Sequence, residues 1–174
     1  KNINLLSSNF YSKKNKKGYI WIQTSSLMSG YLNQSKMTNS VILGTWFFTG
    51  DIGYIDKYNN LVLTGRVRNE INTGGIKVTP EDIDIVLEKH PDIIETCTFG
   101  IPDELAGEIV ATANIFKKNR NASSSNLNNW IKKYISDYKS PKVWYSVSSI
   151  PKTSRGKINR QEVAKFCHKL PKMK

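Results

Sequence analysis

The sequence of 174 residues has few of the features that mark secreted, membrane-spanning or metal-binding proteins. It holds only two cysteines, Cys97 and Cys167, and they do not have the spacing of metal ligands. This scarcity favours a reduced, cytosolic setting, although the two thiols leave one disulfide open. The sequence has no run of about 18 apolar residues, which excludes a membrane-spanning helix. No signal-peptide pattern precedes the first strand, and the chain begins at Lys1, so we expect a fragment of a longer protein.

Acidic residues are scarce too, because 14 Asp and Glu stand against 26 Lys and Arg, for a net charge of +12. The cations cluster within residues 13–17 and again in residues 139–174, where Glu162 is the single acid. Such a field attracts polyanions such as nucleic acid, anionic lipid or the phosphates of ATP and coenzyme A. Since charge runs are usually solvated, the alternative is an ordinary basic surface.

The residue arrangements of common catalytic sites are also missing. The sequence has no Ser-His-Asp arrangement, no complete phosphate loop and no metal-ligand spacing. His90 falls on the apolar face of an expected helix, just before Pro91, and we interpret it as a packed or capping residue. The four tryptophans fall at periodic apolar positions, which indicates core packing and not a base-stacking platform.

Hydrophobic periodicity predicts an α+β fold, a small three-stranded sheet with packed helices, after a β-rich first part. A helix is expected to start at Thr79, the predicted cap, and to stop at Pro91; a second helix is capped by Ser125. The other elements that we expect are strands at 19–24, 93–101, 108–116 and 143–147 and a final helix at 160–168.

Polar chemistry is concentrated between Trp46 and Pro80. The triplet 49–51 reads as a tight turn that ends on the carboxylate of Asp51, and Asn59-Asn60 reads as a hairpin turn. Two cations, Arg66 and Arg68, follow, and then Gly74-Gly75, where a backbone can approach a ligand closely.

Six short motifs occur in order between about Gly18 and Phe166. They read WFFTGD, GRVR, GGIKVTPEDI, IPDELAGE, YKSPK and PKTSRGKINR. Each is weak by itself, but in this order they resemble the adenylate-forming superfamily of acyl-CoA synthetases, luciferases and peptide-synthetase adenylation domains. The resemblance covers the carboxy-terminal portion of such enzymes, so the large amino-terminal domain with its phosphate loop is an expected partner. It implies five parts: residues 1–18 leaning on missing chain, 19–65 the end of the large AMP-binding domain, 66–68 a hinge, 69–170 the carboxy-terminal lobe and 171–174 a tail.

The resemblance also implies roles for individual residues. Lys157 is expected to be catalytic, bridging the substrate carboxylate and the α-phosphate as pyrophosphate leaves. Asp51 is expected to accept hydrogen bonds from the ribose hydroxyls, and Arg66 to contact the nucleotide. Arg68 matches the hinge position, where relatives mostly carry Asp or Lys. The remaining expected binding residues are Gly74 and Gly75, which would line the path of the pantetheine thiol, and Lys139 and Arg160, which would contact phosphate or coenzyme A.

The implied reaction has two steps, formation of an acyl adenylate from a small carboxylic acid and ATP, and then transfer of the acyl group to coenzyme A. Mg²⁺, most of the ATP pocket and the acyl pocket are expected outside these residues, so the isolated chain should be inactive. Two alternatives remain open: transfer to the phosphopantetheine arm of a carrier protein, and a non-catalytic, basic nucleic-acid-binding module. The interpretation as an acyl-CoA synthetase predicts a cytoplasmic enzyme with no specific nucleic-acid partner and no metal ligands within this sequence.

Overall fold

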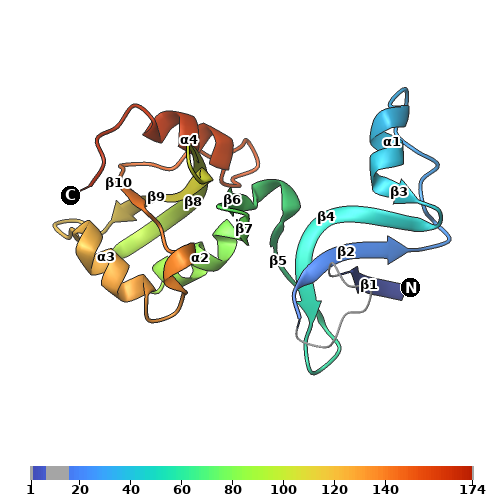
Figure 1. Ribbon diagram of the computed structural model, residues 1–174, viewed down its shortest axis with the longest axis horizontal. Coiled ribbons are helices and arrows are strands. Elements are labelled where there is room, and N and C mark those ends of the chain that lie inside the picture. Colours follow the sequence, from blue (N-terminus) through green and yellow to red (C-terminus); the bar gives the residue numbers. More distant parts are fainter. Residues whose placement is uncertain (1, 7–15, 174) are drawn as a thin grey trace. The chain divides into compact units, whose positions relative to one another are not determined.

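The computed structural model describes residues 2–6 and 16–173. The chain forms two compact units, residues 1–68 and residues 69–174 (Figure 1). Each unit has its own β-sheet. Within the described residues, no helix has the length and apolar character needed to cross a bilayer.

The first unit is an antiparallel sheet around one long strand, β4 (Trp46–Ile55). Three strands pair with β4, and a fourth extends the sheet beyond β2. These are β2 (Gly18–Gln23), β3 (Ile42–Leu43), β5 (Leu61–Arg66) and, next to β2, β1 (Asn2–Leu6); a short helix, α1 (Ser35–Val41), precedes β3.

The loop between β4 and β5 confirms the predicted hairpin turn. Asn59 has a φ of +66°, a left-handed conformation that asparagine tolerates well. Asp56 closes the turn, because its Oδ1 accepts hydrogen bonds from the backbone N–H groups of Tyr58 and Asn60, each at 2.8 Å.

The second unit is a mixed sheet centred on β9 (Gly107–Phe116). The strand β8 (Ile93–Asp103) pairs with it antiparallel along its whole length, whereas β10 (Val143–Ser146) pairs with it parallel. A small hairpin, β6 (Ile71–Thr73) and β7 (Ile76–Val78), joins the sheet through β6. Two parallel strands that follow each other in the chain need a long crossover connection. Residues 117–142 form this connection between β9 and β10, and it contains a helix.

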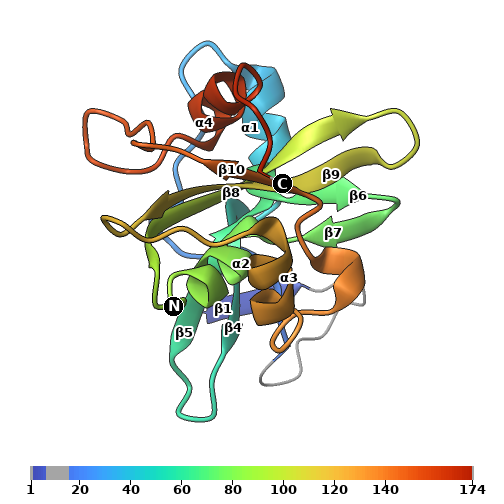
Figure 2. The same cartoon turned by 90° about the vertical axis from the view of Figure 1, so that its left-hand side faces the viewer.

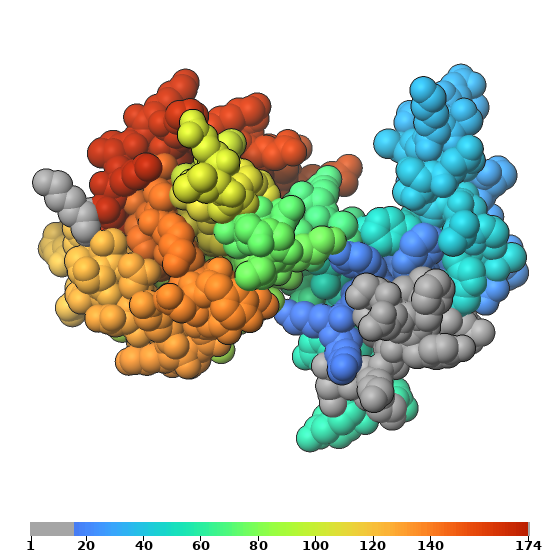
Figure 3. Space-filling model, in the orientation of Figure 1, coloured from blue at the N-terminus to red at the C-terminus, as the bar shows by residue number. Residues whose placement is uncertain are grey.

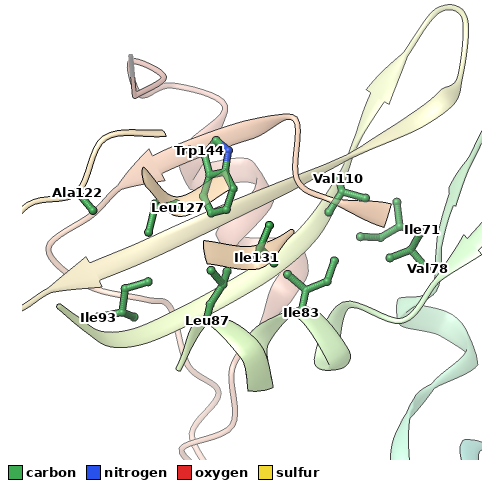
Figure 4. Close-up of a cluster of buried hydrophobic side chains, with 10 residues drawn as sticks. All are labelled: Ile71, Val78, Ile83, Leu87, Ile93, Val110, Ala122, Leu127, Ile131 and Trp144. Atoms are coloured by element: carbon green, nitrogen blue, oxygen red, sulfur yellow. The ribbon is translucent and has the colours of Figure 1, made fainter. Parts of the chain in front are cut away.

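Helices cover both faces of this sheet. Figure 2 shows α2 (Pro80–Leu87) and α3 (Ser124–Ile131) below the sheet and α4 (Arg160–Cys167) above it. Alternate residues of β9 serve the two faces, since Val110 packs with α2 and α3 while Ala111 packs with α4. Figure 4 shows one of the two clusters of buried side chains, which is formed by Ile71, Val78, Ile83, Leu87, Ile93, Val110, Ala122, Leu127, Ile131 and Trp144.

The predicted α+β class is confirmed, and the strands and helices expected after residue 79 are all present. Five of the strands and α-helices were not predicted. The strand β1 arises in a segment that we expected to be unpatterned, and residues 7–15 of that segment lie outside the described residues. The others in the first unit are α1 and β3. In the second unit they are β6 and β7, so its sheet has five strands where three were expected.

The predicted cap of α3 was wrong by two residues. Ser123, and not Ser125, is the N-cap: its side chain accepts a hydrogen bond of 3.2 Å from the backbone N–H of Asn126.

We expect Ser123→Ala to lower the free energy of unfolding by about 1 kcal/mol, because the Asn126 N–H loses its acceptor. Ser125→Ala, on the first turn, is the matched control and should change it by less than about 0.5 kcal/mol. Urea denaturation of the chain measures both, and equal effects would contradict the assignment.

Candidate functional site

Two residues singled out from the sequence, Asp51 and Arg66, lie side by side in the first unit. They are directly opposite each other on β4 and β5, and Arg66 Nε lies 2.6 Å from Asp51 Oδ1. The Asp51 side chain is 21% exposed. Among the described residues, its other oxygen, Oδ2, has no hydrogen-bond partner, which leaves an acceptor for a ligand next to a cation.

The tight turn predicted at 49–51 is wrong, because these residues belong to β4 and form a bulge. The chain keeps its direction, and one residue of β2 faces three of β4. Thr49 holds the bulge, since its hydroxyl donates to the Ile20 carbonyl and accepts from the Asp51 N–H, both at 3.0 Å. Gly50 takes a φ of +71° there, which a residue with a side chain rarely adopts. The bulge re-aims the Asp51 side chain.

Arg68 is exposed and lies in a single 3₁₀ turn, Val67–Asn69. It is the last residue of the first unit, and Asn69 is the first residue of the second. A pivot between domains needs such a short segment at an element end, where a few residues can absorb a change of φ and ψ. The hinge role of Arg68 stays a prediction.

Gly74 and Gly75 form the two-residue turn between β6 and β7, with Thr73 paired to Ile76. Their φ values are +57° and +80°, as a type I′ hairpin turn requires. A Cβ atom on either residue would meet nothing within 4 Å. A side chain at either position would strain the backbone because φ is positive there. It would also occupy the open space in front of the turn.

The glycine turn lies against a second motif of the sequence, IPDELAGE at 101–108. The Gly74 N–H donates to the Ala106 carbonyl at 2.8 Å, and the Asn72 N–H donates to Glu108 Oε2 at 2.8 Å. Asp103 shapes the adjoining β8–β9 turn by accepting from two backbone N–H groups, and Leu105 at its tip is 99% exposed. Figure 3 shows this turn in yellow at the surface of the second unit. The fold therefore joins two motifs that are about 30 residues apart.

Lys157 is exposed on a small closed hairpin in the segment 151–160. Its backbone is held on both sides, because the Thr153 N–H donates to the Lys157 carbonyl at 2.7 Å and the Lys157 N–H donates to Thr153 Oγ1 at 3.3 Å. Gly156 makes the turn with a φ of +76°. The ammonium group has no ion-pair partner within the described residues. An anchored backbone with a free cation can deliver that charge to an oxyanion.

Arg160, the first residue of α4, points into the second unit and is 16% exposed. Its Nη1 lies 2.8 Å from Asp84 Oδ2 and donates to the Thr98 carbonyl at 2.7 Å, while its Nη2 lies 3.3 Å from Glu81 Oε1. Burial raises the pKa of Asp84 to about 6, against the opposing pull of the Arg160 charge. These contacts make Arg160 part of an internal network, and its predicted contact with phosphate or coenzyme A stays a prediction.

Lys139 ends a 3₁₀ turn, Asp137–Lys139, and borders a hollow of about 300 Å³. Its ammonium lies 5.8 Å from the centre of the Tyr138 ring. The hollow lies between α2 and the turn that follows α3, and its walls include Ile83, Val86 and Tyr134. The predicted contact of Lys139 with phosphate or coenzyme A stays a prediction too.

Both cysteines are free and buried, and they belong to one apolar cluster. Burial raises the pKa of Cys97 to about 12 and that of Cys167 to about 11, so both are thiols at neutral pH.

His90 is packed as expected: its ring meets Trp130 edge-on, and its Nδ1 accepts from the Asp92 N–H at 3.2 Å. Across residues 2–6 and 16–173, no group of three His, Cys, Asp or Glu is arranged to hold a metal ion.

Residues 82–157 match the AMP-binding enzyme C-terminal domain. Over these residues the chain is similar to adenylate-forming enzymes. Its relatives are CoA ligases. It is 38% identical to an oxalate–CoA ligase of Saccharomyces cerevisiae over 151 residues, which is 86% of this chain and 28% of that protein. It is 32% identical to a long-chain-fatty-acid–CoA ligase of Bacillus subtilis over 146 residues, 84% of this chain and 26% of the relative. The chain thus spans little more than a quarter of the length of these ligases.

Solved structures of adenylate-forming enzymes share the fold of both units of this chain. An amide bond synthetase from Marinactinospora thermotolerans covers 95% of this chain with a TM-score of 0.85 and 27% identity, and the match takes up 34% of that protein. The o-succinylbenzoate CoA synthetase of Bacillus subtilis, solved with an acyl-adenylate intermediate, covers 99% with a TM-score of 0.82. At 21% identity, that second likeness, 34% of the synthetase, shows the fold alone.

The residues that sequence reasoning missed are the partners of Arg160 in the second unit. Neither Glu81 nor Asp84 was singled out as a site residue from the sequence. A signal was present, because Asp84 falls between Ile83 and Leu87 on the buried side of α2. A carboxylate at such a position requires a buried cation as its partner.

Proposed function

We propose that this chain supplies the carboxy-terminal part of an AMP-forming acyl-CoA ligase. In the first step, a carboxylate oxygen of the acid attacks the α-phosphorus of ATP, and pyrophosphate leaves. In the second step, the sulfur of coenzyme A attacks the acyl carbon, and AMP leaves with the bonding electron pair. The match to the AMP-binding domain and to CoA ligases supports this reaction class. The observation that carries the proposal is Lys157, a free cation on an anchored hairpin.

Lys157 serves the adenylation step in this proposal. Negative charge increases around the α-phosphate while the carboxylate attacks it, and an ammonium group placed there stabilises the transition state more than the ground state. The side chain is exposed and unpaired within the described part of the chain, so little has to be broken before it binds an oxyanion.

Asp51 and Arg66 bind the nucleotide in this proposal. A carboxylate accepts hydrogen bonds from both ribose hydroxyls, and Oδ2 of Asp51 has no other partner among the described residues. Arg66, 53% exposed, fixes the carboxylate through its Nε and keeps further donors for the nucleotide.

The glycine turn serves the second step. Rotation of the second unit about Arg68 would bring Gly74 and Gly75 to the acyl adenylate in place of Lys157, and the absence of side chains leaves room for the pantetheine arm. Among the described residues, no group of three His, Cys, Asp or Glu is placed to hold a metal ion such as Mg²⁺. The two free thiols favour a reducing compartment such as the cytoplasm.

The test is to assay the complete enzyme with ATP, coenzyme A and a panel of carboxylic acids of different length. We expect AMP, pyrophosphate and a thioester in equal amounts with at least one acid. If the acyl group is transferred only to a phosphopantetheinylated carrier protein, that carrier and not coenzyme A is the acceptor. If none of the acids supports ATP–pyrophosphate exchange, the proposal is overturned. The 174-residue chain alone is the control and should show no exchange, because it spans little more than a quarter of the length of the CoA ligases that it resembles.

A further inference from the structure

The hairpin that carries Lys157 is attached to the second unit only at its base. One strand of the base is Pro151-Lys152 and the other is Ile158-Asn159, joined by the Lys152–Ile158 bridge and by a bond of 3.0 Å from the Asn159 N–H to the Pro151 carbonyl. The tip, residues 153–157, is exposed throughout. The position of the Lys157 ammonium therefore depends on what fixes this base.

Two ion pairs hold the base, and they differ in burial. Lys152 Nζ lies 2.8 Å from Glu95 Oε1, with the two side chains 44% and 25% exposed. Arg160 follows Asn159 directly, and its pair with Asp84 has side chains only 16% and 10% exposed. Exposed pairs contribute little to rigidity or stability, whereas a buried, fully hydrogen-bonded pair is costly to break.

The guanidinium of Arg160 reaches three elements at once. It contacts Asp84 and Glu81 on α2 and the Thr98 carbonyl on β8, while its own backbone starts α4. Asp84 is held in turn, because its Oδ1 accepts from the Thr98 N–H at 2.7 Å. A planar fork with several donors satisfies this geometry, and a lysine ammonium cannot reach the three acceptors together.

The network also extends to the start of the second unit. Asn69 Nδ2 donates at 2.8 Å to Glu81 Oε1, the same oxygen that Arg160 Nη2 approaches at 3.3 Å. The residue that directly follows the predicted hinge and the base of the Lys157 hairpin are therefore parts of one hydrogen-bonded assembly.

We propose that Arg160 is a positioning residue for adenylation: its fork to Asp84, Glu81 and the Thr98 carbonyl fixes the base of the hairpin, so that Lys157 moves as one body with the segment after Arg68. The inference rests on the proposed function, because it assigns Arg160 to the step that Lys157 serves. Arg160 does not touch substrate in this view. Its effect on the rate comes through geometry, since a misplacement of about 1 Å can cost about 100-fold in rate.

The test compares Arg160→Lys with Lys152→Ala in the complete enzyme. Arg160→Lys keeps the charge next to Asp84 and removes the fork. We expect kcat for adenylation to fall by about 10-fold to 100-fold with the KM for ATP within about twofold, while thioester formation from added acyl adenylate is unchanged. Lys152→Ala removes the exposed pair on the other strand of the base and should leave both steps within about twofold.

Hydrogen exchange separates a failure of this inference from a failure of the proposed function. The amides of residues 153–159 should exchange faster in Arg160→Lys than in the wild type, whether or not the enzyme makes an acyl adenylate. The positioning role would be overturned by unchanged hydrogen exchange at residues 153–159, by an unchanged rate of adenylation, or by an equal loss in adenylation and thioester formation. Arg160→Ala leaves Asp84 without its cation, and if it does not fold, the lysine variant still decides the question.

Discussion

Replacing Lys157 by alanine in the complete enzyme is expected to lower the rate of adenylation by about 100-fold to 1000-fold, the loss typical of removing one preorganised electrostatic stabiliser. Thioester formation from acyl adenylate that is supplied ready-made should stay within about twofold, because the proposal assigns that step to the glycine turn and not to the hairpin. ATP–pyrophosphate exchange measures the first step, and the release of AMP after adding coenzyme A to the adenylate measures the second.

Arg155→Ala is the matched control for Lys157→Ala. Arg155 is an exposed cation on the same hairpin, and its loss changes the net charge by the same amount. We expect less than about a threefold change in exchange, since charge alone does not place a cation at the α-phosphate. If the two variants lose equal activity, the hairpin acts as a general basic surface and Lys157 has no specific role. If Lys157→Ala leaves exchange intact, the catalytic assignment is wrong.

Replacing Asp51 by alanine is expected to weaken ATP binding by about 100-fold or more. A hydrogen bond to a charged acceptor contributes about 1.5–3 kcal/mol, and the proposal gives Asp51 two of them on the ribose. The chain should still fold, because the lost pair with Arg66 is partly exposed and such pairs add about 1 kcal/mol or less. Titration of the complete enzyme with ATP measures the dissociation constant.

Asp51→Asn is the graded variant in this experiment. It keeps the shape and one carbonyl acceptor and loses the charge, so its affinity for ATP should fall between those of the wild type and Asp51→Ala. Deoxy-ATP analogues give a second check, since removal of a ribose hydroxyl should weaken binding to the wild type and leave Asp51→Ala nearly unaffected. Equal losses in both proteins would place the ribose elsewhere.

Local signals let the sequence predict much of the second unit. Pro80 at the first turn of α2 and Pro91 beyond its end define that helix, and the apolar runs before Gly100 and after Gly107 define β8 and β9. These signals depend on residues close together in the chain. The three-residue strands β6 and β7 were missed because so short a pair has no visible periodicity, and its glycine turn resembles a loop.

The candidate site was predictable only in part, for the same reason. Motif order picked out Asp51, Arg66 and Lys157, but it could not show that Asp51 pairs with Arg66 across a bulge. The network of Arg160 joins residues 69, 81, 84, 98 and 160, and no local pattern connects positions so far apart. Within that network, an arginine that the sequence marked as a phosphate ligand has its Nη atoms directed to internal acceptors.

The inert state of both native sulfhydryls has a practical consequence. Cys97 and Cys167 are buried and protonated, so thiol-directed dyes should ignore them in the folded chain. A cysteine introduced at exposed Leu63 in one unit and another at exposed Leu105 in the other would then accept a donor and an acceptor fluorophore without competition from these two native thiols. In the complete enzyme, energy transfer between the two dyes would then test whether the distance between the units changes during turnover, as the proposed hinge predicts.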